Sequence, residues 1–128
     1  CFAACATSES FLAHINAIND DFLIACLDIG HAEMRPSGSG MIPMIHALGK
    51  HLQALHIHDN DLKHDDHALP FTMSIDFVAM IQALKEINYQ GDLTLEADHV
   101  NRYDAANVQI GITELYEVAK RLKEMFEA

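Results

Sequence analysis

The chain has 128 residues, half of them hydrophobic, which is enough for one globular domain with a buried core. No stretch approaches the roughly 18 consecutive apolar residues of a membrane span, and the first residues do not resemble a secretory signal. With 19 acidic residues against 8 basic ones the formal net charge is −11. This charge argues against nucleic acid as a partner, because such binding draws on basic contacts to phosphate. A small neutral or metal-chelated substrate fits better.

The three cysteines are Cys1, Cys5 and Cys26, an odd number without the spacing of a disulfide framework. They predict a reducing, cytoplasmic compartment. Cys26 lies in an apolar run and is predicted to be a small core residue. The chain begins at Cys1 rather than Met, which suggests processing or a fragment of a longer protein.

Hydrophobic spacing predicts helices that alternate with strands. Apolar residues recur at helical spacing after Thr7 and Ser8, either of which can cap the start of a helix. They recur again before Gly49, which can end a second helix. Phe22 to Leu27 is a short, continuous apolar run, which is typical of a strand buried on both faces. In the first half of the chain we therefore expect a helix over 8–19, a strand over 22–27, a loop over 35–40, a helix over 39–49 and a strand over 52–58.

The second half continues the same alternation. Residues 74–88 form the clearest predicted helix, with Ser74 as its candidate N-cap and Asp76 in its first turn. A strand is predicted over 92–97 and a last helix over 112–126. Strands that alternate with helices imply an α/β fold with a parallel sheet and right-handed crossovers.

Each predicted strand ends in a side chain that can bind a metal ion. Asp28 ends the first strand, His56 lies near the end of the second, and Glu96 ends the third. Neighbouring parallel strands would bring the three side chains to one rim, where α/β folds place their sites. Acidic groups at buried strand ends are costly unless they are paired or ligated. The convergence therefore predicts a site for a divalent cation.

The run from Leu55 to Pro70, L-H-I-H-D-N-D-L-K-H-D-D-H-A-L-P, is rich in the histidines and carboxylates that divalent metals prefer. His58 can face either the site or the neighbouring helices, and we favour the helices. His58, Asp61, His64 and Asp66 are interpreted as ordinary residues of a polar loop.

Five segments together resemble one known family, the xylose isomerase-like TIM barrels, and within it the sugar phosphate isomerase/epimerase group, whose fold is shared with endonuclease IV. They are L-D-I-G-H-A, L-H-I-H-D-N-D, H-D-D-H-A-L-P-F, S-I-D-F and L-T-L-E, which begin at Leu27, Leu55, His64, Ser74 and Leu93. The resemblance implies that residues 1–128 are a single partial domain. It would be the C-terminal portion of a (β/α)8 barrel, with its last three βα units.

The resemblance also assigns roles to individual residues. It implies that Asp28, His56 and Glu96 bind a divalent metal (Mn, Zn, Mg or Co), with Glu96 also catalytic. His31 matches a histidine that contacts substrate in the isomerases or a second metal in the endonucleases, and is taken as catalytic and substrate-binding. Asp59, Asp65 and His67 match site-lining positions; in the endonucleases the last two bind a further metal.

The implied function is a metal-dependent isomerase or epimerase that moves a proton between adjacent carbons of a sugar or sugar phosphate. The alternatives are an endonuclease IV-like apurinic-site phosphodiesterase and an inactive truncated fragment. A full barrel needs eight strands and about 250 residues. With three strands the chain would lack a complete active site and leave an open sheet edge, so it is expected to be part of a longer chain or to self-associate.

Overall fold

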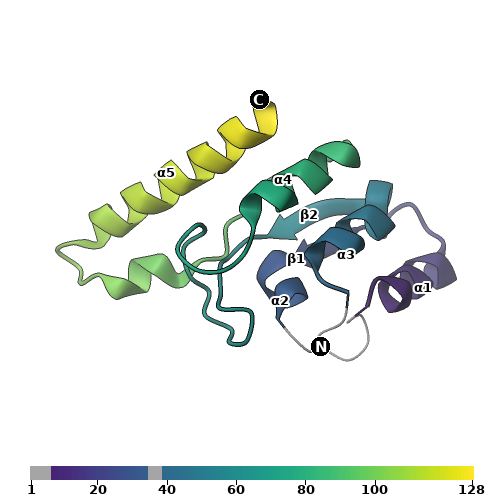
Figure 1. The fold of residues 1–128 in the computed structure, drawn as a ribbon, viewed down its shortest axis with the longest axis horizontal. Coiled ribbons are helices and arrows are strands. Elements are labelled where there is room, and N and C mark those ends of the chain that lie inside the picture. Colours follow the sequence, from purple (N-terminus) through teal and green to yellow (C-terminus); the bar gives the residue numbers. More distant parts are fainter. Residues whose placement is uncertain (1–6, 35–38) are drawn as a thin grey trace.

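The computed structural model describes residues 7–34 and 39–128, in which helices pack on two central parallel strands (Figure 1). Cys1, Cys5 and most of the predicted loop over 35–40 lie outside the described residues. No helix among those described is long and apolar enough to cross a membrane. The elements in chain order are α1 (Ser8–Ile18), β1 (Ala25–Asp28), α2 (Ile29–Glu33), α3 (Met41–Leu48), η1 (Gly49–His51), β2 (Leu52–His56), α4 (Phe77–Glu86), η2 (Asp98–Arg102) and α5 (Val108–Glu127).

The four long helices form a row in which α1 packs on α3, α3 on α4, and α4 on α5 (Figure 1). Thr7 caps α1 by accepting a hydrogen bond from the backbone N–H of Ser10, as predicted. The predicted cap Ser74 is wrong for α4. Asp76 is the N-cap and accepts from the N–H of Ala79 at 3.0 Å, so the helix begins at Phe77.

β1 and β2 pair in parallel, with Leu27 opposite Leu55 and Asp28 opposite His56. The predicted third strand is reduced to a single bridge between Ile57 and Leu95. Two hydrogen bonds form it: Ile57 N–H to the Thr94 oxygen at 2.8 Å, and Glu96 N–H to the Ile57 oxygen at 2.9 Å. The pairing is therefore parallel, as predicted, although it is too short to count as a strand.

The hydrophobic core fills the space between the sheet and the helix row. Leu27, Leu55 and Ile57 point into it from the sheet, and they meet buried side chains from α3, α4 and α5. The helical contribution comes mainly from Met44, Ile45, Leu48, Phe77, Met80, Ile81, Leu84 and Leu122.

The opposite face of the sheet is open within the described residues. Cys26 is exposed, and Ala54 and Thr94 are partly or fully exposed. The predictions that the first strand is buried on both faces and that Cys26 is a core residue are therefore wrong, because the described helices cover one face only. The strand also begins at Ala25 rather than at the predicted Phe22, whose side chain is 94% exposed.

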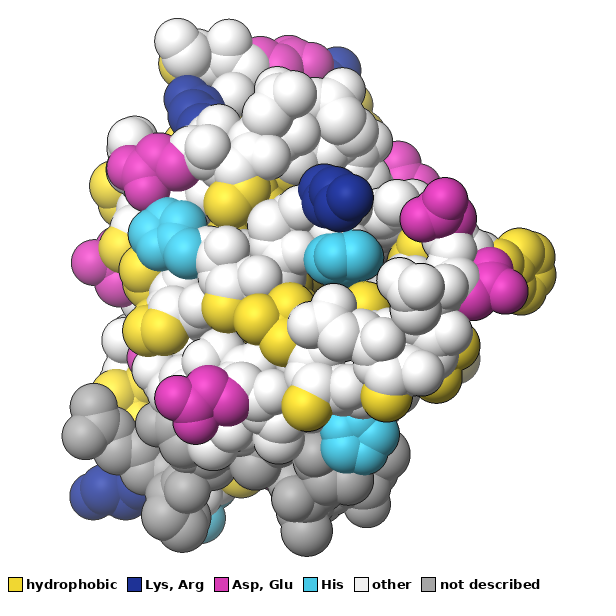
Figure 2. Space-filling model, turned by 90° about the vertical axis from the view of Figure 1, so that its right-hand side faces the viewer, with side chains coloured by type: hydrophobic (Ala, Val, Ile, Leu, Met, Phe, Trp, Pro, Cys, Tyr) yellow, Lys and Arg dark blue, Asp and Glu magenta, His cyan; other side chains and the backbone are white. Residues whose placement is uncertain are grey.

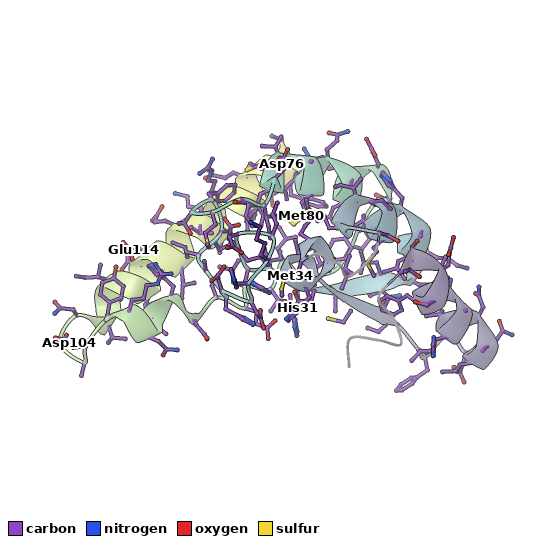
Figure 3. All side chains as sticks on the ribbon, turned by 60° about the horizontal axis from the view of Figure 1, so that its bottom comes forward. His31, Met34, Asp76, Met80, Asp104 and Glu114 are labelled. Carbon is purple, nitrogen blue, oxygen red and sulfur yellow. The ribbon has the colours of Figure 1, made fainter. Side chains whose placement is uncertain are left out.

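The far end of the molecule is held by a polar contact between η2 and α5. The Glu114 carboxylate contacts His99 Nε2 and accepts a hydrogen bond from the Tyr103 hydroxyl at 2.6 Å. Figure 3 labels Glu114 and Asp104 in this arm, away from His31 in the central part of the molecule. On the face drawn in Figure 2, hydrophobic side chains are interrupted by charged and histidine side chains.

Candidate metal and substrate site

The sheet register brings three strand ends to the same rim. Asp28 and His56 are paired neighbours, and Glu96 follows directly after the bridge between Leu95 and Ile57. Because side chains alternate along a strand, Asp28, His56 and Glu96 all project from the open face of the sheet. The predicted convergence of these three side chains is thus present in the structure.

Asp28, His56 and Glu96 form what we call the strand-end cluster. Each offers one potential ligand atom, and these atoms lie within 4.8 Å of one another. His56 Nδ1 is 2.9 Å from Glu96 Oε2, and the two side chains are 47% and 41% exposed. Two carboxylates and one imidazole, reachable from solvent, match the ligand preferences of Mn²⁺, Zn²⁺ and related cations. The donor set therefore fits a divalent ion.

Asp28 is also held from its other side. Its Oδ1 accepts from the backbone N–H of His31 at 2.9 Å and from His58 Nε2 at 3.1 Å, and its Oδ2 lies 2.8 Å from His31 Nδ1. Burial alone would raise the pKa of the Asp28 carboxyl, but the hydrogen bonds from His58 and His31 outweigh it and hold the pKa well below its usual value. Asp28 is therefore a carboxylate at neutral pH.

His31, His58, Asp65 and His67 form a second group, the histidine cluster, whose potential ligand atoms also lie within 4.8 Å of one another. Asp65 bridges two of its rings, at 3.2 Å from His31 Nε2 and 3.1 Å from His67 Nε2. His67 Nδ1 donates to the Glu96 backbone oxygen at 2.9 Å, which links the cluster to the third strand segment. The structure thus brings His31, Asp65 and His67 together, as their predicted shared role requires.

Carboxylates and one backbone carbonyl of this region favour the protonated form of two of the histidines, His31 and His67. Burial opposes protonation of His31, but Asp28 and Asp65 outweigh it and raise the pKa of His31. The hydrogen bond to the Glu96 carbonyl and the nearby charge of Asp65 raise the pKa of His67. In the metal-free protein both rings therefore hold a proton to higher pH than an isolated histidine.

Asp59 organises the loop that follows β2 and is fully buried. Its Oδ2 accepts from the N–H groups of Thr72 and Met73, at 3.0 and 2.8 Å, and its Oδ1 accepts from Ser74 and Ile75, at 3.1 and 3.0 Å. The prediction that Asp59 contacts substrate is corrected by this geometry, because a fully buried carboxylate saturated by backbone donors is not available to a ligand.

His58 is the residue that the sequence interpretation misplaced. It lies on the site side of β2 rather than among the helices, it is fully buried, and it contacts Asp28. The sequence H-I-H already indicated this position for His58. Residues two apart in a strand share a face, and His56 was predicted to lie at the site. In contrast, Asp61 and His64 pair locally at 2.7 Å in an exposed turn, as expected for loop residues.

Family comparison agrees with this architecture. Residues 2–124 match the model of the xylose isomerase-like TIM barrel family, so the chain belongs to that family. The α/β fold is that of a partial TIM barrel. The predicted family and fold class are therefore confirmed.

Solved structures of similar fold include D-allulose 3-epimerase from Methylomonas sp., with a TM-score of 0.73 and 21% identity over 93% of this chain and 44% of that one. Another is an L-ribulose 3-epimerase, with a TM-score of 0.70 and 18% identity over 97% of this chain and 43% of that one. These likenesses establish the fold.

Curated relatives are similar in sequence but much longer. The uncharacterised protein y4fM of Sinorhizobium fredii (strain NBRC 101917 / NGR234) is 34% identical over 84% of this chain and 33% of its own length. The uncharacterised protein MJ1311 of Methanocaldococcus jannaschii is 29% identical over 73% of this chain and 32% of its own length. The chain thus spans about a third of the curated relatives it matches.

Proposed function

We propose that this chain carries part of the active site of a metal-dependent sugar or sugar-phosphate isomerase or epimerase. The strand-end cluster is the observation that carries the proposal, because it joins two carboxylates and an imidazole at the rim where barrel enzymes place their chemistry. Membership of the xylose isomerase-like family supports it. So does the likeness of fold to proteins described as sugar 3-epimerases.

In this proposal Asp28, His56 and Glu96 hold the divalent cation, which is Mn²⁺, Zn²⁺, Mg²⁺ or Co²⁺. When bound, the cation supplies Lewis acidity toward substrate oxygens and so acidifies the carbon-bound proton beside them. Glu96 takes that proton as general base, and its half-exposed side chain on the open face can meet a substrate. His31 binds a substrate oxygen, with Asp65 and His67 lining the same side of the site.

Moving a proton between neighbouring carbons, or from one face of a carbon to the other, requires a second acid-base group. Within residues 7–34 and 39–128 no further carboxylate joins the strand-end cluster. We propose that the missing group and the cover for the open sheet face come from further barrel strands of a longer protein or from a second copy of the chain. Complete activity then belongs to the assembled protein.

The test is exchange of a carbon-bound substrate proton with solvent. Full-length protein loaded with Mn²⁺ is incubated with D-allulose and other ketoses in D₂O, and deuterium incorporation is followed by NMR. E96Q should abolish incorporation, while E86Q, which changes an exposed glutamate paired with His46, should leave it intact. Incorporation by E96Q at the wild-type rate would remove Glu96 from the role of base.

The histidine cluster favours one other candidate, a phosphodiesterase of the endonuclease IV type that uses a second metal. His31, Asp65 and His67 provide two imidazoles and a carboxylate beside the first site. The net charge of −11 opposes it, because a phosphate backbone would be repelled. Cleavage of an abasic-site oligonucleotide by full-length protein, lost in H67A, would favour this function over the isomerase.

A further inference from the structure

Asp28 belongs to the strand-end cluster, but the groups that fix its orientation belong to the histidine cluster. Its Oδ1 faces His58 Nε2 at 3.1 Å, and an ionised carboxylate can only accept a hydrogen bond. His58 must therefore donate from Nε2. Its Nδ1 is buried and has no hydrogen-bond partner among the described residues.

The His58 ring is locked in place by its surroundings. It stacks on His67 with a centroid separation of 4.1 Å and an interplanar angle of 9°, and it meets His31 edge-on at 5.3 Å. It also lies against the backbone of Gly30, where an added Cβ would overlap the imidazole atoms. Gly30 lies in α2 and does not have a positive φ, so its backbone does not require a glycine. The absence of a side chain instead leaves room for the His58 ring.

We propose that His58 is a positioning residue, which holds the Asp28 carboxylate in the orientation that a cation at the strand-end cluster needs. Outer partners of this kind fix ligand orientation in metal sites, and their loss costs about 10- to 100-fold in metal affinity. This inference rests on the proposed metal site. It also gives a reason for a fully buried histidine two residues after His56, the proposed ligand that ends β2.

The proposal is tested by titrating full-length protein with Co²⁺ and following both the visible absorption of the bound ion and the heat of binding. H58F fills the space without a donor, whereas H58Q keeps a side-chain N–H. H58F should bind Co²⁺ about 10- to 100-fold more weakly, and H58Q should recover most of the affinity. G30A, which crowds the ring, should resemble H58F. Thermal unfolding in EDTA checks that each variant is folded.

Wild-type affinity in H58F would overturn the proposal, as would equal losses in folded H58F and H58Q. A second measurement needs neither metal nor variant: the tautomer of His58 in metal-free protein, read from long-range ¹H–¹⁵N NMR correlations. An Nε2–H tautomer supports the bond to Asp28, and an Nδ1–H tautomer overturns it. If wild-type protein binds no Co²⁺ at all, the proposed function fails, and the tautomer still decides the contact of His58 with Asp28.

Discussion

The strand-end cluster is joined to the histidine cluster through Asp28, which contacts His58 and His31, yet the chain builds the two clusters in different ways. The strand-end cluster follows from sheet register, because three parallel segments end at one rim. The histidine cluster depends on a loop, since Asp65 and His67 reach His31 only when the chain after β2 folds back. One cluster is half-exposed and suited to substrate, and the other includes the fully buried His58. A site of this kind thus needs both the sheet and the loop.

The largest expected effect comes from Asp28, a member of the strand-end cluster that also contacts the histidine cluster. D28A removes a proposed ligand and also leaves His58 Nε2 without its acceptor. We expect Co²⁺ affinity to fall by more than the roughly 100-fold that loss of an outer partner causes. Calorimetric titration measures the Co²⁺ affinity. D61A is the control, because it removes a carboxylate from an exposed turn outside both clusters. Retained affinity in D28A would separate Asp28 from the metal site.

Next in size is the effect of disrupting the loop alone. In the wild type the N–H groups of Thr72 and Met73 donate to the Asp59 carboxylate. D59N would replace one carboxylate oxygen by an NH₂ group, which cannot accept, and would leave buried backbone N–H groups unsatisfied. The free energy of unfolding should fall by about 2–4 kcal/mol, because each buried unsatisfied donor costs about 1–3 kcal/mol. Urea unfolding of metal-free protein measures this loss. D61N, in the exposed turn of the same loop, should change it little, and equal losses in the two variants would contradict the assignment.

A smaller effect should separate the clusters. D65N weakens the bridge between His31 and His67. Because the Asp65 side chain is 45% exposed, the stability loss should stay within about 1 kcal/mol. The strand-end cluster keeps all three of its proposed ligands, so Co²⁺ affinity should remain close to that of the wild type. An affinity loss as large as that of H58F would mean that the two clusters act as one site.

The smallest effect is the dependence of stability on pH, which should have opposite signs in the two clusters. His31 and His67 have pKa values raised by folding, so their contribution is complete below the unfolded histidine pKa and is lost as pH rises through their folded values. Asp28 has a lowered pKa, so its contribution is lost only in acid. Unfolding midpoints in EDTA above pH 6 should therefore fall less steeply in H67Q than in the wild type. An unchanged slope would contradict the role of His67.

The convergence of Asp28, His56 and Glu96 could be predicted from sequence because it needs only strand order and alternation. The alternation also contained the position of His58, since His56 and His58 share a face. The role of Asp59 could not be found this way, because its partners, the N–H groups of residues 72–75, become neighbours only through the loop fold. The exposure of Cys26 escaped prediction for a different reason. An apolar run indicates burial on both faces, whereas the described helices cover only one.

The central claim is that the strand-end cluster binds a divalent cation, and titration of full-length protein with Co²⁺ in wild type, H56A and H46A tests it most directly. His46 is an exposed histidine that pairs with Glu86 away from the cluster. H46A therefore shows the effect of removing a histidine that is not a proposed ligand. We predict that wild type and H46A bind one Co²⁺ with similar affinity and the same visible spectrum, and that H56A loses both. Wild-type affinity and spectrum in H56A would contradict the assignment of the site.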